Sequence, residues 1–128
     1  DNYSVIISAR GDTVGGLNDG ARSALKELGL VKLAEAESAD RYVAVIEGGK
    51  VTREEISDSA DIDTGEFRVL GFKTHVISTQ RTSTIQMGKK NFSLNERGMN
   101  IVVLDNTTKK IVDKVRFKTY YVMLTATR

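Results

Sequence analysis

The sequence predicts an α+β domain built as a sandwich of two antiparallel β-sheets, with one main helix packed alongside. Three observations lead to this prediction. Segments rich in β-branched residues lie at both ends of the chain, tight-turn sequences separate several of them, and only about residues 18–28 carry apolar residues at helical spacing. The order of strand, helix and then many strands is typical of an α+β domain.

The composition excludes several classes of protein. The 128 residues suit one domain, and 19 Lys and Arg against 17 Asp and Glu give a net charge of +2. So small a charge argues against a dedicated nucleic-acid surface, and no apolar run approaches the roughly 18 residues of a membrane span. Since there is no Cys, disulfides and thiolate sites are excluded. We expect no nucleic-acid partner and no membrane insertion.

The organisation of the chain is that of one unit, residues 1–128. It has no Pro, no low-complexity tract and no internal repeat, so no linker is expected. The first residues, DNYSVIISARG, lack the basic and apolar regions of a signal peptide and instead predict a strand. We therefore expect a domain excised from a larger chain, which would carry any export signal.

The first half of the chain predicts a strand, a helix and a hairpin. Residues 3–9 are rich in β-branched residues and end at a turn, so they predict a buried strand. The helix begins at Asn18 or Asp19, which can cap it, and Gly29 can close it. Its apolar stripe, which includes Leu25, is expected to pack on a sheet. Strands over 42–47 and 51–56 flank Gly48-Gly49, a pair suited to a tight hairpin turn.

The second half predicts further strands. Residues 58–66 are acidic and turn-rich, which predicts a loop. Residues 67–78 alternate moderately and 80–84 are polar, which fits a strand, a turn and another strand. We also predict a short hairpin around Gly88 and a hairpin of 99–104 with 111–117, followed by a terminal strand over 120–126.

Catalytic and metal-binding constellations are weak. His75 is the only His and lies in a predicted strand, which disfavours a His-dependent triad. We therefore expect no enzyme activity, no catalytic residues and no cofactor. Asp61, Asp63 and Glu66 resemble the opening of a calcium loop but lack its complete pattern, so an acidic surface loop is favoured and cation binding stays open.

Two blocks of the sequence resemble the GG domain family, which is also called the interleukin-like epithelial-to-mesenchymal transition inducer (ILEI) family. One block, RGMNIVVLD at 97–105 with TTKKIVD at 107–113 and RFKTY at 116–120, resembles the family's R-G-I-N hairpin. The other, SVII at 4–7 with LNDGAR at 17–22 and GGK at 48–50, resembles its strand, helix and G-G-K segments. Together the blocks cover well over half of the chain.

The two blocks stand in reversed order relative to the family, which indicates a circular permutation. Permutation joins termini that lie close together, so we expect the first and last strands to be neighbours. The chain also departs from the family pattern at Lys109 and Lys118 and lacks the cysteines of the secreted vertebrate members. The missing cysteines point to a bacterial or phage relative rather than to a secreted vertebrate member.

The resemblance implies a two-sheet sandwich that acts as a non-catalytic recognition module, with carbohydrate as the expected ligand. It assigns ligand binding to Asp12 in the loop after the first strand, and to Arg41 and Tyr42 at the start of another; Ala39 stands where the family has Arg. We expect a glycan or surface polysaccharide as partner, neighbouring domains of a bacterial surface or phage tail protein, and an extracellular or virion-associated location. The alternative is a purely structural or protein-interaction module of a fibre or tail.

Overall fold

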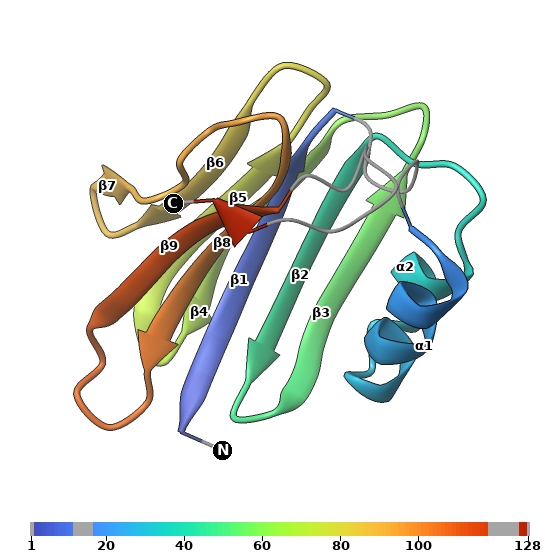
Figure 1. Ribbon diagram of the computed structural model, residues 1–128. Helices are drawn as coiled ribbons and strands as arrows, with labels where there is room; N and C mark the ends of the chain where they lie inside the picture. The colour runs from blue at the N-terminus through green and yellow to red at the C-terminus, as the bar shows by residue number, and fades with distance from the viewer. Residues whose placement is uncertain (1, 12–16, 118–125, 128) are drawn as a thin grey trace.

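The computed structural model describes residues 2–11, 17–117 and 126–127, and in this part of the chain two antiparallel sheets face each other. The larger sheet has the strand order β10-β9-β8-β1-β2-β3, and the smaller sheet has the order β4-β5-β6-β7 (Figure 1). The predicted α+β sandwich is confirmed. The elements are β1 (Tyr3–Arg10), α1 (Asp19–Glu27), α2 (Val31–Glu35), β2 (Arg41–Glu47), β3 (Lys50–Ser57), β4 (Ile62–Val69), β5 (Phe72–Ser78), β6 (Ser83–Met87), β7 (Lys90–Asn91), β8 (Gly98–Asp105), β9 (Ile111–Phe117) and β10 (Ala126–Thr127).

The larger sheet is built from the segments that the sequence predicted most clearly. β1 lies at its centre, paired antiparallel with β2 on one side and β8 on the other. The predicted hairpin of β2 and β3 is present, and both turn glycines have positive φ angles, +58° at Gly48 and +83° at Gly49. Such angles are strained for residues with a Cβ atom, which explains the glycine pair.

The smaller sheet corrects two predictions. The acidic segment 58–66 was predicted to be a loop, but β4 begins at Ile62 and pairs with β5. A register shift between Asp63 and Glu66 forms a bulge, where Gly65 has a φ of +66°. The segment 67–78 is not one strand either, because Leu70 and Gly71 form a turn with positive φ angles and divide it into β4 and β5.

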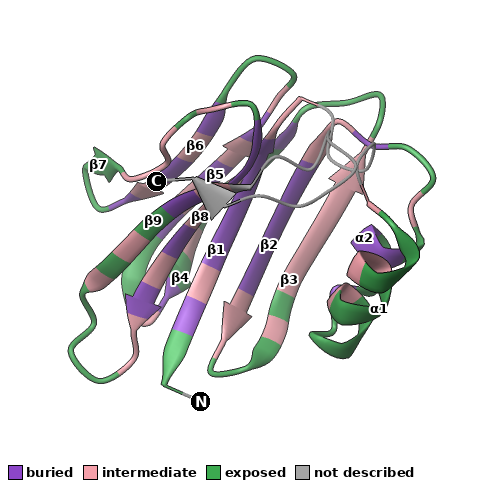
Figure 2. Ribbon diagram, in the orientation of Figure 1, coloured by how far each residue is buried: buried purple, intermediate pink, exposed green. Residues whose placement is uncertain are grey.

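The core lies between the two sheets. Ile6, Val43, Val45, Val76 and Ile85 are fully buried there, and they come from alternate positions of strands in both sheets (Figure 2). The smaller sheet packs on β1, β2 and β3. A second buried cluster, which includes Tyr42 and Leu33, lies on the opposite face of the larger sheet, where α2 covers it.

The helices confirm one prediction and correct another. The helix predicted over 18–28 is present as α1, and the side chain of Asn18 caps it by accepting a hydrogen bond from the Ala21 N–H at 2.8 Å. However, none of the nine described residues of α1 is buried; Leu25 is half-buried and Leu28 is 57% exposed. The apolar stripe of α1 was predicted to pack on the sheet, but its side chains are not buried against it. The sequence did not predict α2.

The ends of the described chain lie at opposite ends of the strands. At the start of β1, Tyr3 pairs with Asp105. Ala126 pairs with Phe117, and Phe117 pairs with Met99, which lies opposite Ala9 near the end of β1 (Figure 1). The first and last strands were predicted to lie close together, but their described residues do not. Most of the terminal strand predicted over 120–126 lies outside the described residues.

Candidate functional site

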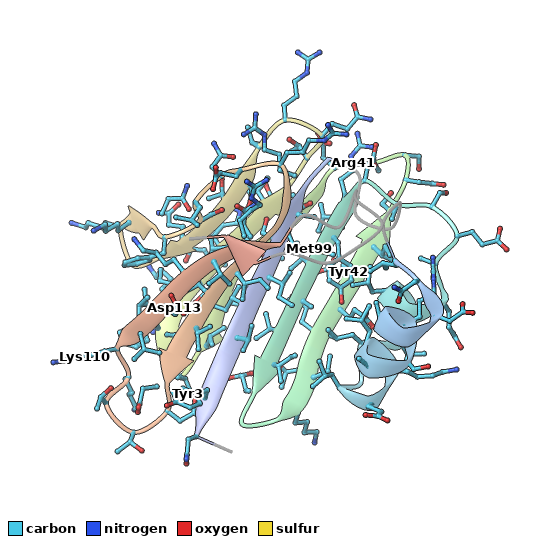
Figure 3. The ribbon with its side chains drawn as sticks, viewed as in Figure 1. Tyr3, Arg41, Tyr42, Met99, Lys110 and Asp113 are labelled. Carbon is cyan, nitrogen blue, oxygen red and sulfur yellow. The ribbon has the colours of Figure 1, made fainter. Side chains whose placement is uncertain are left out.

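The structure describes two of the three residues predicted to bind ligand, and the side chains of these two do not share one surface. Asp12 lies outside the described residues. Arg41 and Tyr42 are neighbours at the start of β2, so their side chains point to opposite faces of the sheet (Figure 3). Arg41 contacts Asp61, just before β4, while Tyr42 belongs to the buried cluster on the helix side.

Tyr42 is fully buried, which corrects its expected role in ligand binding. Its hydroxyl group donates a hydrogen bond to Glu54 Oε2 at 2.7 Å. Burial, together with the hydrogen bond to Glu54 and the negative charge of that residue, raises the pKa of Tyr42 far above its ordinary value. The hydroxyl therefore stays protonated and serves as a donor.

Glu54 joins this hydroxyl to the start of α2. Its Oε1 accepts from the Lys32 N–H and its Oε2 from the Leu33 N–H, each at 3.0 Å. These are N–H groups of the first turn of α2, which have no partner within the helix. Tyr42 and Glu54 thus anchor α2 to the larger sheet, and their role is structural.

Arg41 forms a polar network at one end of the sandwich. Its Nη1 lies 2.5 Å from Asp40 Oδ1 and its Nε lies 3.1 Å from Asp61 Oδ1, while Gln80 Nε2 donates to Asp40 Oδ2 at 2.5 Å. We call these four residues the Arg41 corner. The Arg41 side chain is only 12% exposed, whereas Asp61 is 60% exposed. The corner is therefore a fixed guanidinium surrounded by side chains that reach solvent.

The charges of the corner stabilise one another. Burial opposes ionisation of Asp40, but the hydrogen bonds from Gln80 and Arg41 outweigh it and lower the pKa of the carboxyl group. The hydrogen bond from Arg41 to Asp40, with Asp61 nearby, raises the pKa of the guanidinium. At neutral pH the corner thus holds two carboxylates and one guanidinium, which together can donate and accept hydrogen bonds.

The end of β1 meets this corner. The Gly11 N–H donates to the Thr79 carbonyl at 3.3 Å, and a Cβ atom on Gly11 would lie 3.6 Å from the carbonyl oxygen of Gln80. The segment after β5 therefore contacts both the end of β1 and the residue just before β2. The sequence did not predict Gln80 or the pairing of Asp61 with Arg41. Gln80 lies 40 positions from Asp40 along the chain, and Asp61 lies 20 positions from Arg41.

The acidic residues of the candidate calcium loop are each paired with a basic side chain. Asp61 contacts Arg41, Asp63 Oδ1 is hydrogen-bonded to His75 Nε2, and Glu66 lies 3.6 Å from Lys73. The Gly65 N–H and then His75 lower the pKa of Asp63. Within the described ranges, no three His, Asp or Glu residues lie close enough together to hold a metal ion.

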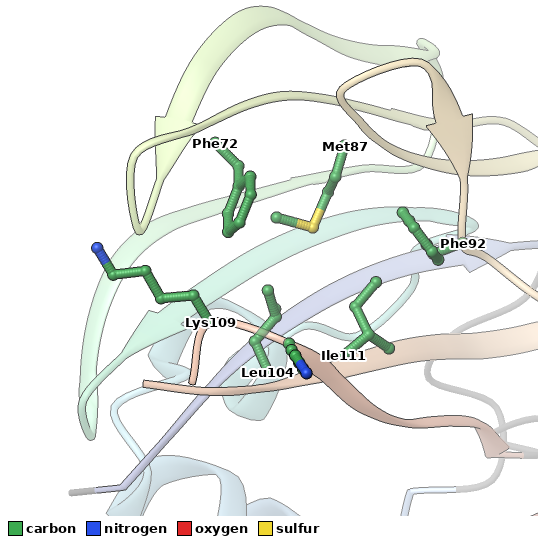
Figure 4. Close-up of a pocket in the computed structure, with 7 residues that line it drawn as sticks. Phe72, Met87, Phe92, Leu104, Lys109 and Ile111 are labelled. Atoms are coloured by element: carbon green, nitrogen blue, oxygen red, sulfur yellow. The ribbon is translucent and has the colours of Figure 1, made fainter. Parts of the chain in front are cut away.

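Two apolar cavities lie away from the Arg41 corner. The larger, of about 440 Å³, separates α1 from the larger sheet and is lined by residues that include Val5, Ile7, Ile101, Leu25 and Leu28. We call it the helix groove. The smaller, of about 260 Å³, lies between the smaller sheet and the β8–β9 hairpin (Figure 4). We call it the hairpin pocket.

Comparison with known proteins gives no match of any kind. No family model matches the chain, and no curated protein or solved structure is significantly similar to it. Neither helix in the described part of the chain is long and apolar enough to cross a membrane.

Proposed function

We propose that the protein is a non-catalytic recognition module that binds carbohydrate through the Arg41 corner. The observation that supports this proposal most is the network itself, in which Arg41 is held by Asp40 and Asp61 and extended by Gln80. The resemblance to the GG domain family supports the same ligand class. It also supports the setting: a bacterial surface or phage tail protein, outside the cell or on the virion.

The chemistry of the corner suits a neutral polyol. Adjacent sugar hydroxyls donate to carboxylate oxygens and accept from guanidinium or amide N–H groups, and charge-assisted hydrogen bonds of this kind are stronger than neutral ones. Because the side chains already hold one another, little conformational entropy is lost when a ligand binds. Desolvation offsets much of the gain, so we expect an affinity on the order of micromolar to millimolar per sugar unit.

The proposal reassigns the predicted residues. Arg41 keeps its ligand-binding role and gains Asp40 and Gln80 as partners, while Tyr42 becomes a scaffold residue. The role of Asp12, which lies outside the described residues, rests on the family resemblance alone.

A glycan array with the isolated chain tests this function. We expect the chain to bind one class of glycan, and Gln80→Ala to weaken that binding at least tenfold, since it removes a donor at the corner without deleting a charge. Gln86→Ala is the matched control, because the Gln86 side chain lies on β6 and donates to the Gly88 carbonyl in the adjacent turn rather than to a residue of the corner. Equal loss in both variants, or no bound glycan at all, would contradict the proposal.

The helix groove favours a second candidate, a structural or protein-interaction module without a glycan ligand. Leu28 is 57% exposed at the edge of an apolar cavity, and exposed apolar patches often form protein contacts. A chain that folds, binds no glycan on the array and forms a stable complex with a neighbouring domain of its parent protein would support this candidate over the first.

A further inference from the structure

The hairpin pocket has an apolar interior and a basic rim. On one side the interior is formed by Met87 of β6 and by Phe92, which follows β7. On the other side it is formed by Leu104 and Ile111 of the β8–β9 hairpin (Figure 4). Lys109 and Lys110, in the turn of that hairpin, are exposed and complete the lining. Polar groups are thus confined to one side of the pocket.

The pocket is an open extension of the core. Leu104 is 1% exposed and Met87 is 6% exposed, and both belong to the cluster between the two sheets. Phe72, by contrast, is 39% exposed at the start of β5. Ile111 of the β8–β9 hairpin packs against this cluster but is only half-buried, so part of its apolar surface stays open in the pocket. An apolar ligand would continue the core packing there.

The rim carries positive charge that the described residues do not neutralise. Neither Lys109 nor Lys110 forms an ion pair with any described residue, and the ammonium group of Lys90 lies 5.4 Å from the centre of the Phe92 ring. Of the two carboxylates in the same hairpin, Asp105 already accepts hydrogen bonds from the Thr107 and Thr108 N–H groups and Asp113 accepts one from the Lys114 N–H, and neither lines the pocket. A bound anion would therefore meet lysines rather than carboxylates at the rim.

We propose that the hairpin pocket binds a free medium-chain aliphatic carboxylate, with its tail against Leu104 and Met87 and its carboxylate at Lys109 and Lys110. The volume of about 260 Å³ lies below the roughly 300–1,000 Å³ of drug-sized sites, so it suits one short chain. The basic rim selects an anion over an alcohol or an amine. The pocket lies at the opposite end of the strands from the Arg41 corner, so this ligand is independent of the proposed glycan.

Titration with octanoate, followed by methyl and amide NMR, tests the proposal. We expect saturable shifts at Leu104, Met87 and Ile111, and binding of octanol and octylammonium at least fivefold weaker than that of octanoate. The double variant Lys109→Gln with Lys110→Gln should weaken octanoate binding at least fivefold without changing the fold, since both side chains are exposed.

The double variant Lys26→Gln with Lys50→Gln is the matched control, because these exposed lysines do not line the hairpin pocket. Four results would overturn the proposal: no octanoate binding at millimolar concentration, equal binding of octanol, equal loss in the control variant, or shifts confined to the helix groove. Tighter binding to phosphatidylglycerol vesicles than to free octanoate would also overturn it, since the ligand would then be a lipid surface.

Discussion

Replacing Tyr42 with Phe removes one hydroxyl group from the contact between the larger sheet and α2. The aromatic ring stays in place, so no cavity forms, and the change deletes only the 2.7 Å hydrogen bond to Glu54. A hydrogen bond to a charged group contributes about 1.5–3 kcal/mol. Because Glu54 is half-buried and keeps its bonds to the Lys32 and Leu33 N–H groups, we expect the lower half of that range, about 1.5–2 kcal/mol.

The assay is urea unfolding, with thermal unfolding as a second measurement. For a domain of this size 1 kcal/mol corresponds to about 4 °C, so the melting temperature of Tyr42→Phe should fall by about 6–8 °C. Tyr3→Phe is the matched control, because Tyr3 is 49% exposed, and its free energy of unfolding should change by less than about 0.5 kcal/mol. A change below about 0.5 kcal/mol in Tyr42→Phe as well would refute the anchoring role of Tyr42 and Glu54.

Three further predictions concern a helix, a turn and a pH response. Leu25→Ala should lower the free energy of unfolding in urea by only about 1 kcal/mol, because Leu25 is half-buried beside the helix groove; a loss of about 2–5 kcal/mol would mean that the groove is closed in solution. Gly49→Val should cost at least about 1 kcal/mol in the same assay, since φ is +83° there, and an unchanged midpoint would contradict the turn. The pKa of Asp40 is lower in the folded chain than its ordinary value of 3.8, so ionised Asp40 stabilises the fold at pH values above 3.8. This contribution is lost as the pH falls through the pKa of Asp40 in the folded chain. As the pH is lowered to about 2, the urea midpoint of Asp40→Asn should therefore fall less steeply than that of the unchanged protein. Equal falls in the two proteins would exclude this contribution.

The parts of the fold that could be predicted from the sequence are those that local contacts determine. The β2–β3 hairpin depends on Gly48 and Gly49, and α1 depends on the Asn18 cap and on helical spacing. The strand β4 could not be predicted, because its acidic residues are matched by partners elsewhere: Asp63 by His75, and Glu66 by Lys73, both on β5.

Helix α2 was missed for the same physical reason. It has only five residues, which is too short to be stable alone, and its first turn depends on Glu54 of β3. The candidate site followed this pattern. Arg41 was predicted as a ligand-binding residue from the sequence. The pairing that places Gln80 beside Asp40 and the burial of Tyr42 could not be predicted, because both depend on contacts between distant segments.

Amide NMR shifts during titration with a panel of glycans test the central claim most directly, because they report binding and its place on the chain together. The account predicts saturable shifts at Asp40, Arg41, Asp61 and Gln80 for one class of glycan, at concentrations on the order of micromolar to millimolar. The Leu104 and Ile111 amides, in the hairpin pocket, should not move. If no glycan shifts the amides of the Arg41 corner at millimolar concentration, carbohydrate recognition by this module is contradicted.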